Sequence, residues 1–359
     1  MRQSLLLCFV CAFALGAMLP MHCEAAAQDK GKPTTFDLHE LGFPKNDDGN
    51  IKVGVFYSAA NRIGVYFDQE PQNSARIHRF VVLMFDPAAH VTAKLALLAN
   101  PSAMNIQPGP NGGVLFGSSS KLELYDDGLN LSKTIKLPLS VTGVSFDVGL
   151  NQLVISEIDN SAGHRTALFF DGSTLQKTGS IDYPIESGPT FGKDQLAYVT
   201  SGECIRSTFI ASLTSQWPSD VRVCDPLVFP TADTLAYVYD GELRVVNSQN
   251  SEIFHMRIRE PHSDSLPAFS GISNDRSRIA INAVRDAKTK SLVAFDFQQR
   301  SVAMMVPDYQ HEVHVYDMPT KKLVFKRALT PGSASEALSS DGHALATIEA
   351  GTLNIYAIP

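Results

Sequence analysis

The residues best suited to bind a metal ion lie in the segment His311-Glu312-Val313-His314. Histidine and carboxylate side chains are common zinc ligands, but a zinc-binding helix carries its two histidines four positions apart. The two histidines here are three positions apart, and residues with that spacing on a β-strand point to opposite faces. We therefore interpret the segment as an ordinary junction of loop and strand and expect no metal site in it.

The segment Asn46-Asp47-Asp48-Gly49-Asn50 is a candidate start for a calcium-binding loop. Its first, third and fifth side chains place oxygen atoms at alternate positions, as the first ligands of such a loop require. The invariant glycine and the bidentate glutamate of the loop are replaced by Ile51 and Tyr57. A solvated turn is therefore expected. Cys-x-x-Cys-His, the motif of covalently bound haem, is absent from residues 28–359, and we predict no metal and no cofactor.

The N-terminus has the pattern of a secretory signal. Arg2 precedes an apolar run over residues 5–19, and Ala25-Ala26-Ala27 offers the small residues that a signal peptidase accepts. An uncut membrane anchor is the alternative, but the run is shorter than the roughly 20 residues that a membrane span needs. We predict cleavage after Ala27, a polar leader over residues 28–33, and a periplasmic or extracellular location.

Two of the five cysteines, Cys204 and Cys224, remain once residues 1–27 are removed. An even pair in an oxidising compartment is a disulfide candidate. Residues 207–213 and 221–223 have the pattern of two hairpin strands, which would bring the cysteines roughly opposite each other, within reach of a bridge. We predict a disulfide, with two unbridged buried thiols as the alternative.

One short pattern recurs along the chain: a turn rich in Ser, Asp, Asn and Gly, followed by an apolar strand. Its clearest copies are Ser339-Ser340-Asp341-Gly342-His343-Ala344-Leu345-Ala346 and Ser273-Asn274-Asp275-Arg276-Ser277-Arg278-Ile279-Ala280, which align without a gap. Internal repeats of this length are typical of propellers and solenoids. The turn residues of all copies fall near positions 61, 111, 149, 194, 233, 275 and 341.

Between these turns lie pairs of apolar segments separated by polar turns. Residues 122–126 with 134–137, and 243–247 with 254–258, are examples. Each repeat thus holds about four short strands with two-residue alternation, which is the composition of a propeller blade. We predict an all-β fold over residues 34–359: a single seven-bladed β-propeller with four-stranded antiparallel blades, closed by a strand within residues 33–60.

Six and eight blades are the alternatives to seven. The stretch before the last turn holds two strand pairs, 291–306 and 312–329. They fit either a hairpin inserted into the sixth blade or a rudimentary eighth blade.

The repeated Ser-x-Asp-Gly-x-x-Leu-Ala turn resembles the blade motif of bacterial exported propellers, which include WD-repeat-like, Tol-type and YVTN-type proteins and relatives of the quinoprotein amine dehydrogenase β chain. Tyr198-Val199-Thr200-Ser201 is similar to the YVTN tetrapeptide itself. The chain departs from the WD-repeat pattern, because it has one tryptophan, Trp217, and no Trp-Asp dipeptide. The resemblance implies the architecture and transfers no function.

Propeller hydrolases of the lactonase type hold a metal with acidic, Asn or His residues at one mouth of the central channel. The candidates for such a mouth are Glu186, His262 and Asp264, of which the last two lie in the polar loop 260–264. Three residues are too few to define a site, and we expect an exposed connection.

Charge and motifs limit the function classes. The chain has a formal net charge of -7 and lacks the excess of basic residues expected of a nucleic-acid-binding protein. The sequence also has no Gly-x-Ser-x-Gly elbow and no phosphate-binding glycine loop. The densest basic cluster is interpreted as the solvated edge of a strand; it comprises Lys321, Lys322, Lys326 and Arg327.

The leading hypothesis is an exported propeller that binds a protein, peptide or glycan on a loop-rich face, without catalysis. Two alternatives remain. One is a propeller enzyme of the lactonase or quinoprotein oxidoreductase type, and the other is a non-catalytic subunit of such an enzyme. An enzyme requires ionisable side chains from several blades to converge on the central channel, so the channel lining separates the hypotheses.

Overall fold

The protein is described from a computed structural model. It describes residues 31–45, 51–71, 76–101, 104–118, 120–185, 188–199, 208–214, 217, 226–239, 242–257, 268–295, 301–329 and 335–359. The predicted signal segment, residues 1–27, lies outside these ranges.

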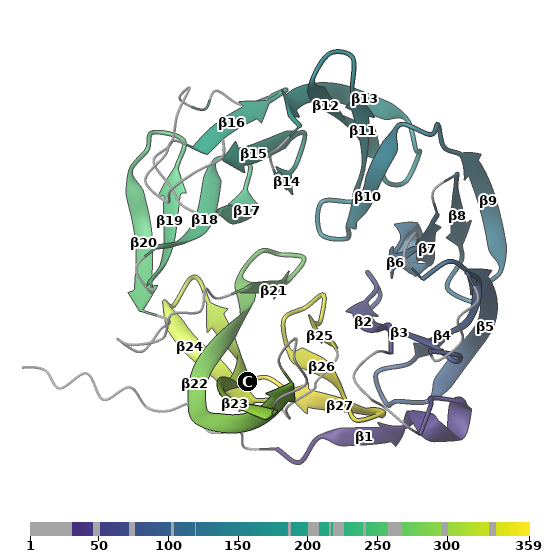
Figure 1. Ribbon diagram of the computed structural model, residues 1–359. Helices are drawn as coiled ribbons and strands as arrows, with labels where there is room; N and C mark the ends of the chain where they lie inside the picture. Colours follow the sequence, from purple (N-terminus) through teal and green to yellow (C-terminus); the bar gives the residue numbers. More distant parts are fainter. Residues whose placement is uncertain are drawn as a thin grey trace, which may run out of the picture.

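Seven antiparallel sheets surround a central axis, and in blades 1 to 6 the first strand of the blade lies nearest the axis (Figure 1). The predicted seven-bladed β-propeller is thereby confirmed. Blades 1 to 3 each have four strands in chain order. Their strands are β2 (Val53–Tyr57), β3 (Ile63–Asp68), β4 (His78–Phe85), β5 (Val91–Ala99); β6 (Asn105–Pro108), β7 (Val114–Gly117), β8 (Lys121–Tyr125), β9 (Leu131–Lys136); β10 (Val141–Asp147), β11 (Gln152–Asp159), β12 (His164–Asp171), β13 (Lys177–Pro184).

Blade 4 has three strands within the described residues, and blades 5 and 6 have four each. The helical elements of the described chain are two 3-10 turns, η1 (Leu38–Leu41) and η2 (Pro110–Gly112). No helix in the described residues is long and apolar enough to cross a membrane. The strands are β14 (Thr190–Gly192), β15 (Gln195–Val199), β16 (Thr208–Ser212); β17 (Pro226–Thr231), β18 (Thr234–Tyr239), β19 (Glu242–Asn247), β20 (Glu252–Arg257); β21 (Ala268–Ile272), β22 (Arg278–Phe295), β23 (Ser301–Asp317), β24 (Lys322–Ala328).

The ring is closed by the two ends of the described chain. Blade 7 contains β25 (Ser335–Leu338), β26 (Ala344–Glu349) and β27 (Thr352–Ala357), and its outermost strand is β1 (Thr34–Asp37). β1 pairs antiparallel with β27, with Phe36 opposite Leu353. The predicted N-terminal closing strand is confirmed, and the closure prevents blade 7 from separating from blade 1.

The core is divided into seven hydrophobic clusters, one at each interface between neighbouring blades. This division follows from the two-residue alternation of the strands, because successive side chains point to opposite faces of a blade. In β7, for example, Val114 and Phe116 pack against blade 1, while Leu115 packs against blade 3. A blade that was apolar on one face only would leave one of these interfaces without a core.

The repeated turns join the first and second strands of the blades. In the last copy the hydroxyl of Ser339 donates to Asp341 Oδ1 (2.7 Å) and accepts the backbone N–H of Ala344 (2.8 Å), while the N–H of His343 donates to Asp341 (2.9 Å). The same three bonds recur in the turn that starts at Ser273, at 2.6–3.0 Å. The sequence repeat is therefore a repeated hydrogen-bond pattern, since Ser and Asp satisfy backbone groups that the tight turn leaves unpaired.

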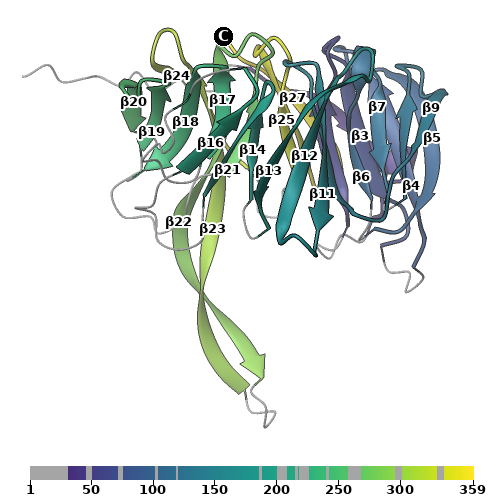
Figure 2. The same ribbon diagram turned by 90° about the horizontal axis from the view of Figure 1, so that it is seen from above.

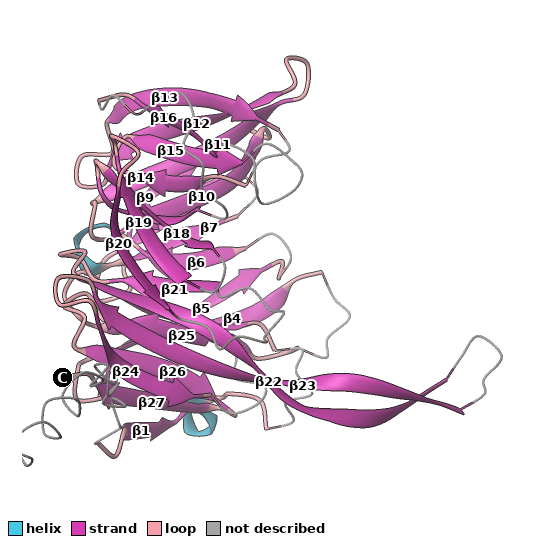
Figure 3. Cartoon of the chain, turned by 90° about the vertical axis from the view of Figure 1, so that its left-hand side faces the viewer, coloured by secondary structure: helices cyan, strands magenta, loops and turns pink. Residues whose placement is uncertain are grey.

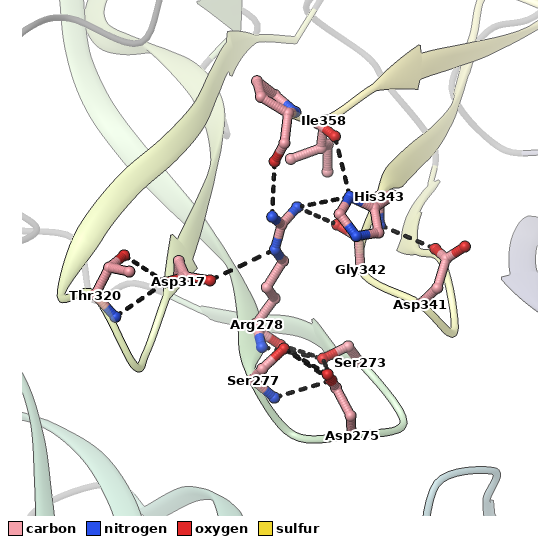
Figure 4. A network of polar contacts seen from close by, with 11 residues as sticks. Ser273, Asp275, Ser277, Arg278, Asp317, Thr320, Asp341, Gly342, His343 and Ile358 are labelled. Carbon is pink, nitrogen blue, oxygen red and sulfur yellow. Dashed lines mark hydrogen bonds and ion pairs between the residues drawn. The ribbon is translucent and has the colours of Figure 1, made fainter.

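A network around Arg278 connects blade 6 to blade 7 (Figure 4). Its guanidinium donates to the carbonyl of Gly342 (3.0 Å) and to Pro359 O (2.7 Å), and its Nε lies 3.7 Å from Asp317 Oδ1. The C-terminus is therefore held on the face where the repeated turns lie.

Blade 6 differs from the others because β22 and β23 extend far beyond the disc as a two-stranded ribbon (Figures 2 and 3). β21 pairs with β22 only as far as Asn282, and β24 pairs with β23 only from Glu312 onward. Beyond these points β22 and β23 pair only with each other, from Val284 to Phe295 along β22, with one register shift between Ala287 and Thr289. Residues 291–295 and 301–306 thus belong to blade 6, as the outer half of its β22–β23 hairpin, and form no eighth blade.

Candidate functional site

A cavity of about 440 Å³ lies between the inner strands on the propeller axis. Its wall includes residues of β10, β14, β17, β21 and β25 and of the turn that follows β10. Polar and apolar residues both line it, and Val228, Ile272 and Leu338, from three different blades, are among the apolar ones. The lining is therefore mixed, with apolar surface only slightly in excess of polar surface.

Two turns from opposite sides of the ring meet at one end of this cavity. The turn after β10, in blade 3, carries Asp147, and the turn after β21, in blade 6, carries Arg276; Nη2 of Arg276 donates to Asp147 Oδ1 at 2.6 Å. The backbones are also in contact, since a Cβ added to Gly149 would lie 3.0 Å from Cα of Asn274. We call this contact the cross-axis bridge. It ties blades 3 and 6 together, and the absence of a side chain at Gly149 allows it.

The cross-axis bridge is electrostatically asymmetric. The side chain of Arg276 is 9% exposed and that of Asp147 is 32% exposed. Nε and Nη1 of Arg276 are inaccessible to solvent and have no hydrogen-bond partner within the described chain. The carboxylate of Asp147 also accepts the backbone N–H of Leu150 at 2.9 Å. Among the described residues, Asp147 therefore provides the single carboxylate that compensates the charge of this guanidinium.

Asp147 is the one charged residue among those that line the cavity within the described part of the chain. Uncharged polar residues lie beside it. Ser145 of β10 is exposed to the cavity, and neither its hydroxyl nor the side-chain amide of Asn274 has a hydrogen-bond partner among the described residues. The cavity therefore offers free neutral donors and acceptors, while its single charge is already paired.

Tyr57, at the end of β2, also contributes to the wall. Its hydroxyl is buried and has no hydrogen-bond partner in the described structure. Burial, and then the negative charge of Asp341, raises the pKa of Tyr57 well above its usual range. The hydroxyl stays protonated at any ordinary pH and cannot serve as a base.

The segment His311-Glu312-Val313-His314 lies within β23 and not at a junction of loop and strand, so that interpretation was wrong. Glu312 and His314 share one face of the strand and are joined by a hydrogen bond of 3.1 Å between Oε2 and Nε2. Lys326 of β24 pairs with the same carboxylate at 2.9 Å. The side chain of His311 lies outside the described residues.

Glu312 and His314 are buried at the base of the ribbon, and Lys326 pairs with Glu312 from a partly exposed position. Burial acts to raise the pKa of Glu312, but the hydrogen bonds from Lys326 and His314 outweigh it and hold that pKa below its usual value. Burial lowers the pKa of His314, which therefore stays neutral at pH 7. His314 Nδ1 lies 3.0 Å from the hydroxyl of Tyr316, so both ring nitrogens have partners.

No group of three or more His, Cys, Asp or Glu side chains within the described ranges has the geometry to hold a metal ion. The candidates at residues 46–50, Glu186, His262 and Asp264 lie outside those ranges, as do Cys204 and Cys224. The disulfide therefore stays a prediction.

The predicted basic strand edge lies at β24, the outer strand of blade 6. Lys321 and Lys322 are exposed. Lys326 pairs with Glu312, and the guanidinium of Arg327 lies 4.8 Å from the ring of Tyr356. Lys321 Nζ lies 5.6 Å from the ring centre of Phe254. Three of the four basic residues therefore have partners, and Lys322 is the member that is solvated as expected.

No family model matches the sequence, and the search of curated proteins found no match. Solved structures do match in fold. Hydrazine synthase of Kuenenia stuttgartiensis superposes with a TM-score of 0.52 and 13% identity, over 88% of this chain and 97% of that one. The WD40 domain of Neurospora crassa Pan2 superposes with a TM-score of 0.51 and 10% identity, over 90% and 94%. Similarity at this level of identity concerns the propeller fold alone.

Proposed function

We propose that the protein is a binding propeller that acts outside the cytoplasm, and that a protein partner docks on the face that carries the ribbon. The observation that carries this proposal is the ribbon itself. From Val284 to Phe295, paired with Ser301 to His311, no third strand lies beside either edge in the described structure. At about 3.3 Å per residue the projection reaches roughly 40 Å.

The composition of the ribbon changes along its length. The inner half contains Arg285, Asp286, Lys288, Lys290 and Asp308, whereas residues 291–295 and 301–306 contain no charged residue at all. A two-stranded ribbon is marginally stable in water, and uncharged free edges readily pair with other chains. A protein surface that covers the outer half removes both problems, which favours a partner over a free-standing projection.

The cavity lining supports binding over catalysis. A propeller enzyme of the hydrolase type needs several ionisable groups that converge on the axis. The described lining has one, Asp147, and it is compensated by Arg276. The described residues therefore contain no acid–base pair and no nucleophile with its base at the axis.

The extracytoplasmic location rests on the sequence. The apolar run over residues 5–19 and Ala25-Ala26-Ala27 support export and cleavage after Ala27. In an oxidising compartment Cys204 and Cys224 would form a disulfide. N-terminal sequencing and thiol titration of the protein recovered from its own cells test both points.

Cross-linked affinity capture from the native cell envelope tests the function. The tag belongs at the N-terminus of the mature chain, because Arg278 holds Pro359. The matched variant replaces residues 284–311 by Asn-Gly, which closes the hairpin next to the Ala283–Glu312 pair and keeps Glu312. Its unfolding midpoint should equal that of the intact chain.

Recovery of one protein with the intact chain and its loss with the ribbonless variant supports the proposal. Equal recovery with both variants would refute the role of the ribbon. Failure to recover any partner with either variant would refute the binding function.

A further inference from the structure

We propose that the axial cavity is a binding site for a small uncharged ligand with several hydroxyl groups, of the kind that a sugar residue presents. This site is distinct from the ribbon and does not depend on the proposed protein partner. The cavity volume of about 440 Å³ falls within the range of roughly 300–1,000 Å³ that is typical of small-molecule sites.

The electrostatics of the cavity select against charged ligands. The carboxylate of Asp147 is held by Arg276 at 2.6 Å, and the remaining guanidinium nitrogens of Arg276 are inaccessible. An ionised carboxylate or phosphate would therefore lose hydration without gaining a counter-charge, which is costly. An ammonium group would find the one carboxylate of the lining already paired with Arg276. A neutral ligand loses far less on entry.

The free polar groups lie on opposite walls. Ser145 belongs to β10 of blade 3, and Asn274 lies in the turn after β21 of blade 6, across the axis. The cross-axis bridge holds these two blades in contact, because the Arg276–Asp147 pair and the close approach of Gly149 to Asn274 both join them. A ligand in the cavity would therefore meet a hydroxyl on one wall and an amide on the other.

The rest of the wall suits the non-polar surface of such a ligand. Phe191, Val228 and Leu338 line the cavity from three further blades. Sugar rings combine hydroxyl edges with C–H faces, and C–H faces pack on aliphatic and aromatic side chains while the hydroxyls form hydrogen bonds. The combination of free neutral polar groups, apolar surface and no free charge matches this chemistry.

Saturation-transfer NMR on the mature full-length chain tests the proposal. The probes are glucose, galactose, mannose and N-acetylglucosamine, with glucuronate and glucosamine as charged counterparts of the same size. We expect transfer to at least one neutral sugar and none to the charged ones. Ser145→Leu fills the cavity from the wall and should weaken binding by about tenfold or more.

The matched control is Ser180→Leu. Ser180 lies in β13, the outermost strand of the same blade, and is exposed, so this substitution changes the same residue type away from the cavity. Asn274→Ala removes the amide on the opposite wall without adding volume and provides a second measurement if Ser145→Leu disturbs folding. Ser145→Leu and Asn274→Ala should both bind the neutral sugar more weakly than Ser180→Leu does.

Loss of transfer in Ser145→Leu and Asn274→Ala, with retention in Ser180→Leu, supports the site. Absence of transfer from every neutral sugar overturns the ligand class. Equal signals from charged and neutral sugars, or unchanged signals in both cavity variants, overturn the site.

Discussion

Replacement of Asp147 by asparagine should destabilise the propeller, whereas replacement of its partner Arg276 by methionine should not. Asparagine keeps an acceptor for the backbone N–H of Leu150, so the change isolates the charge. It leaves the guanidinium of Arg276 buried, with the side chain 9% exposed and no carboxylate beside it. Methionine instead removes a buried cation, two of whose nitrogens already lack partners.

The magnitudes follow from the general cost of buried ions. Breaking a buried pair by removal of one partner costs about 3–5 kcal/mol, because the other charge is left uncompensated. Asp147 is a third exposed, so water relieves part of that cost, and we expect a loss of about 2 kcal/mol for Asp147→Asn. Replacement of a buried ion by an apolar residue of similar volume is often neutral or stabilising. We therefore expect Arg276→Met to change the stability by less than about 1 kcal/mol.

Urea unfolding of the two single variants and the double variant provides the assay. In the double variant the loss caused by Asp147→Asn should largely disappear, since no buried cation remains to be compensated. A loss of stability in Arg276→Met equal to that in Asp147→Asn would refute this reasoning. Such a result would mean that the pair itself, and not the uncompensated charge, determines the stability.

Two further predictions concern the repeated turns and the base of the ribbon. Ser339→Ala removes a buried hydroxyl that both donates and accepts a hydrogen bond in its turn. The substitution should lower the free energy of unfolding by about 1–2 kcal/mol in urea titrations. An unchanged unfolding midpoint would contradict the role given to the Ser-x-Asp pattern. Because burial lowers the pKa of His314 in the folded state, the unfolded chain takes up the proton first, and stability should fall as the pH decreases below about 6.5. His314→Gln should flatten stability curves measured between pH 7 and 5, and an identical slope in both proteins would show that another group is responsible.

The blade architecture could be predicted from the sequence because its causes are local. The side chains of a Ser-x-Asp turn form hydrogen bonds with the backbone groups of the same turn. Two-residue alternation places successive side chains of a strand on opposite faces of the blade. The seven turns near 61, 111, 149, 194, 233, 275 and 341 all join the first and second strands of a blade. The closing strand was also predictable, since the last blade lacks a fourth strand of its own.

The candidate site was not found in the sequence, because its parts are single residues on separate blades. Ser145 carries no motif, and Asn274 was recognised only as a member of a repeated turn. The signal that could have indicated both as site residues is their position at the ends of innermost strands. His311-Glu312-Val313-His314 was recognised as polar, but its location within β23 depends on how far the hairpin extends.

The sequence by itself therefore determined the all-β secondary structure and the repeat, because those features arise from interactions between residues close in the chain. The choice of seven blades over six or eight came from the sheet topology. Only the tertiary structure decided which turns meet at the axis. Asp147 and Arg276 are 129 positions apart in the chain, and their atoms approach to 2.6 Å because the ring of blades closes. No local sequence pattern predicts this contact. The same holds for the ribbon: its length depends on where β21 and β24 stop pairing, which is a property of the assembled blade.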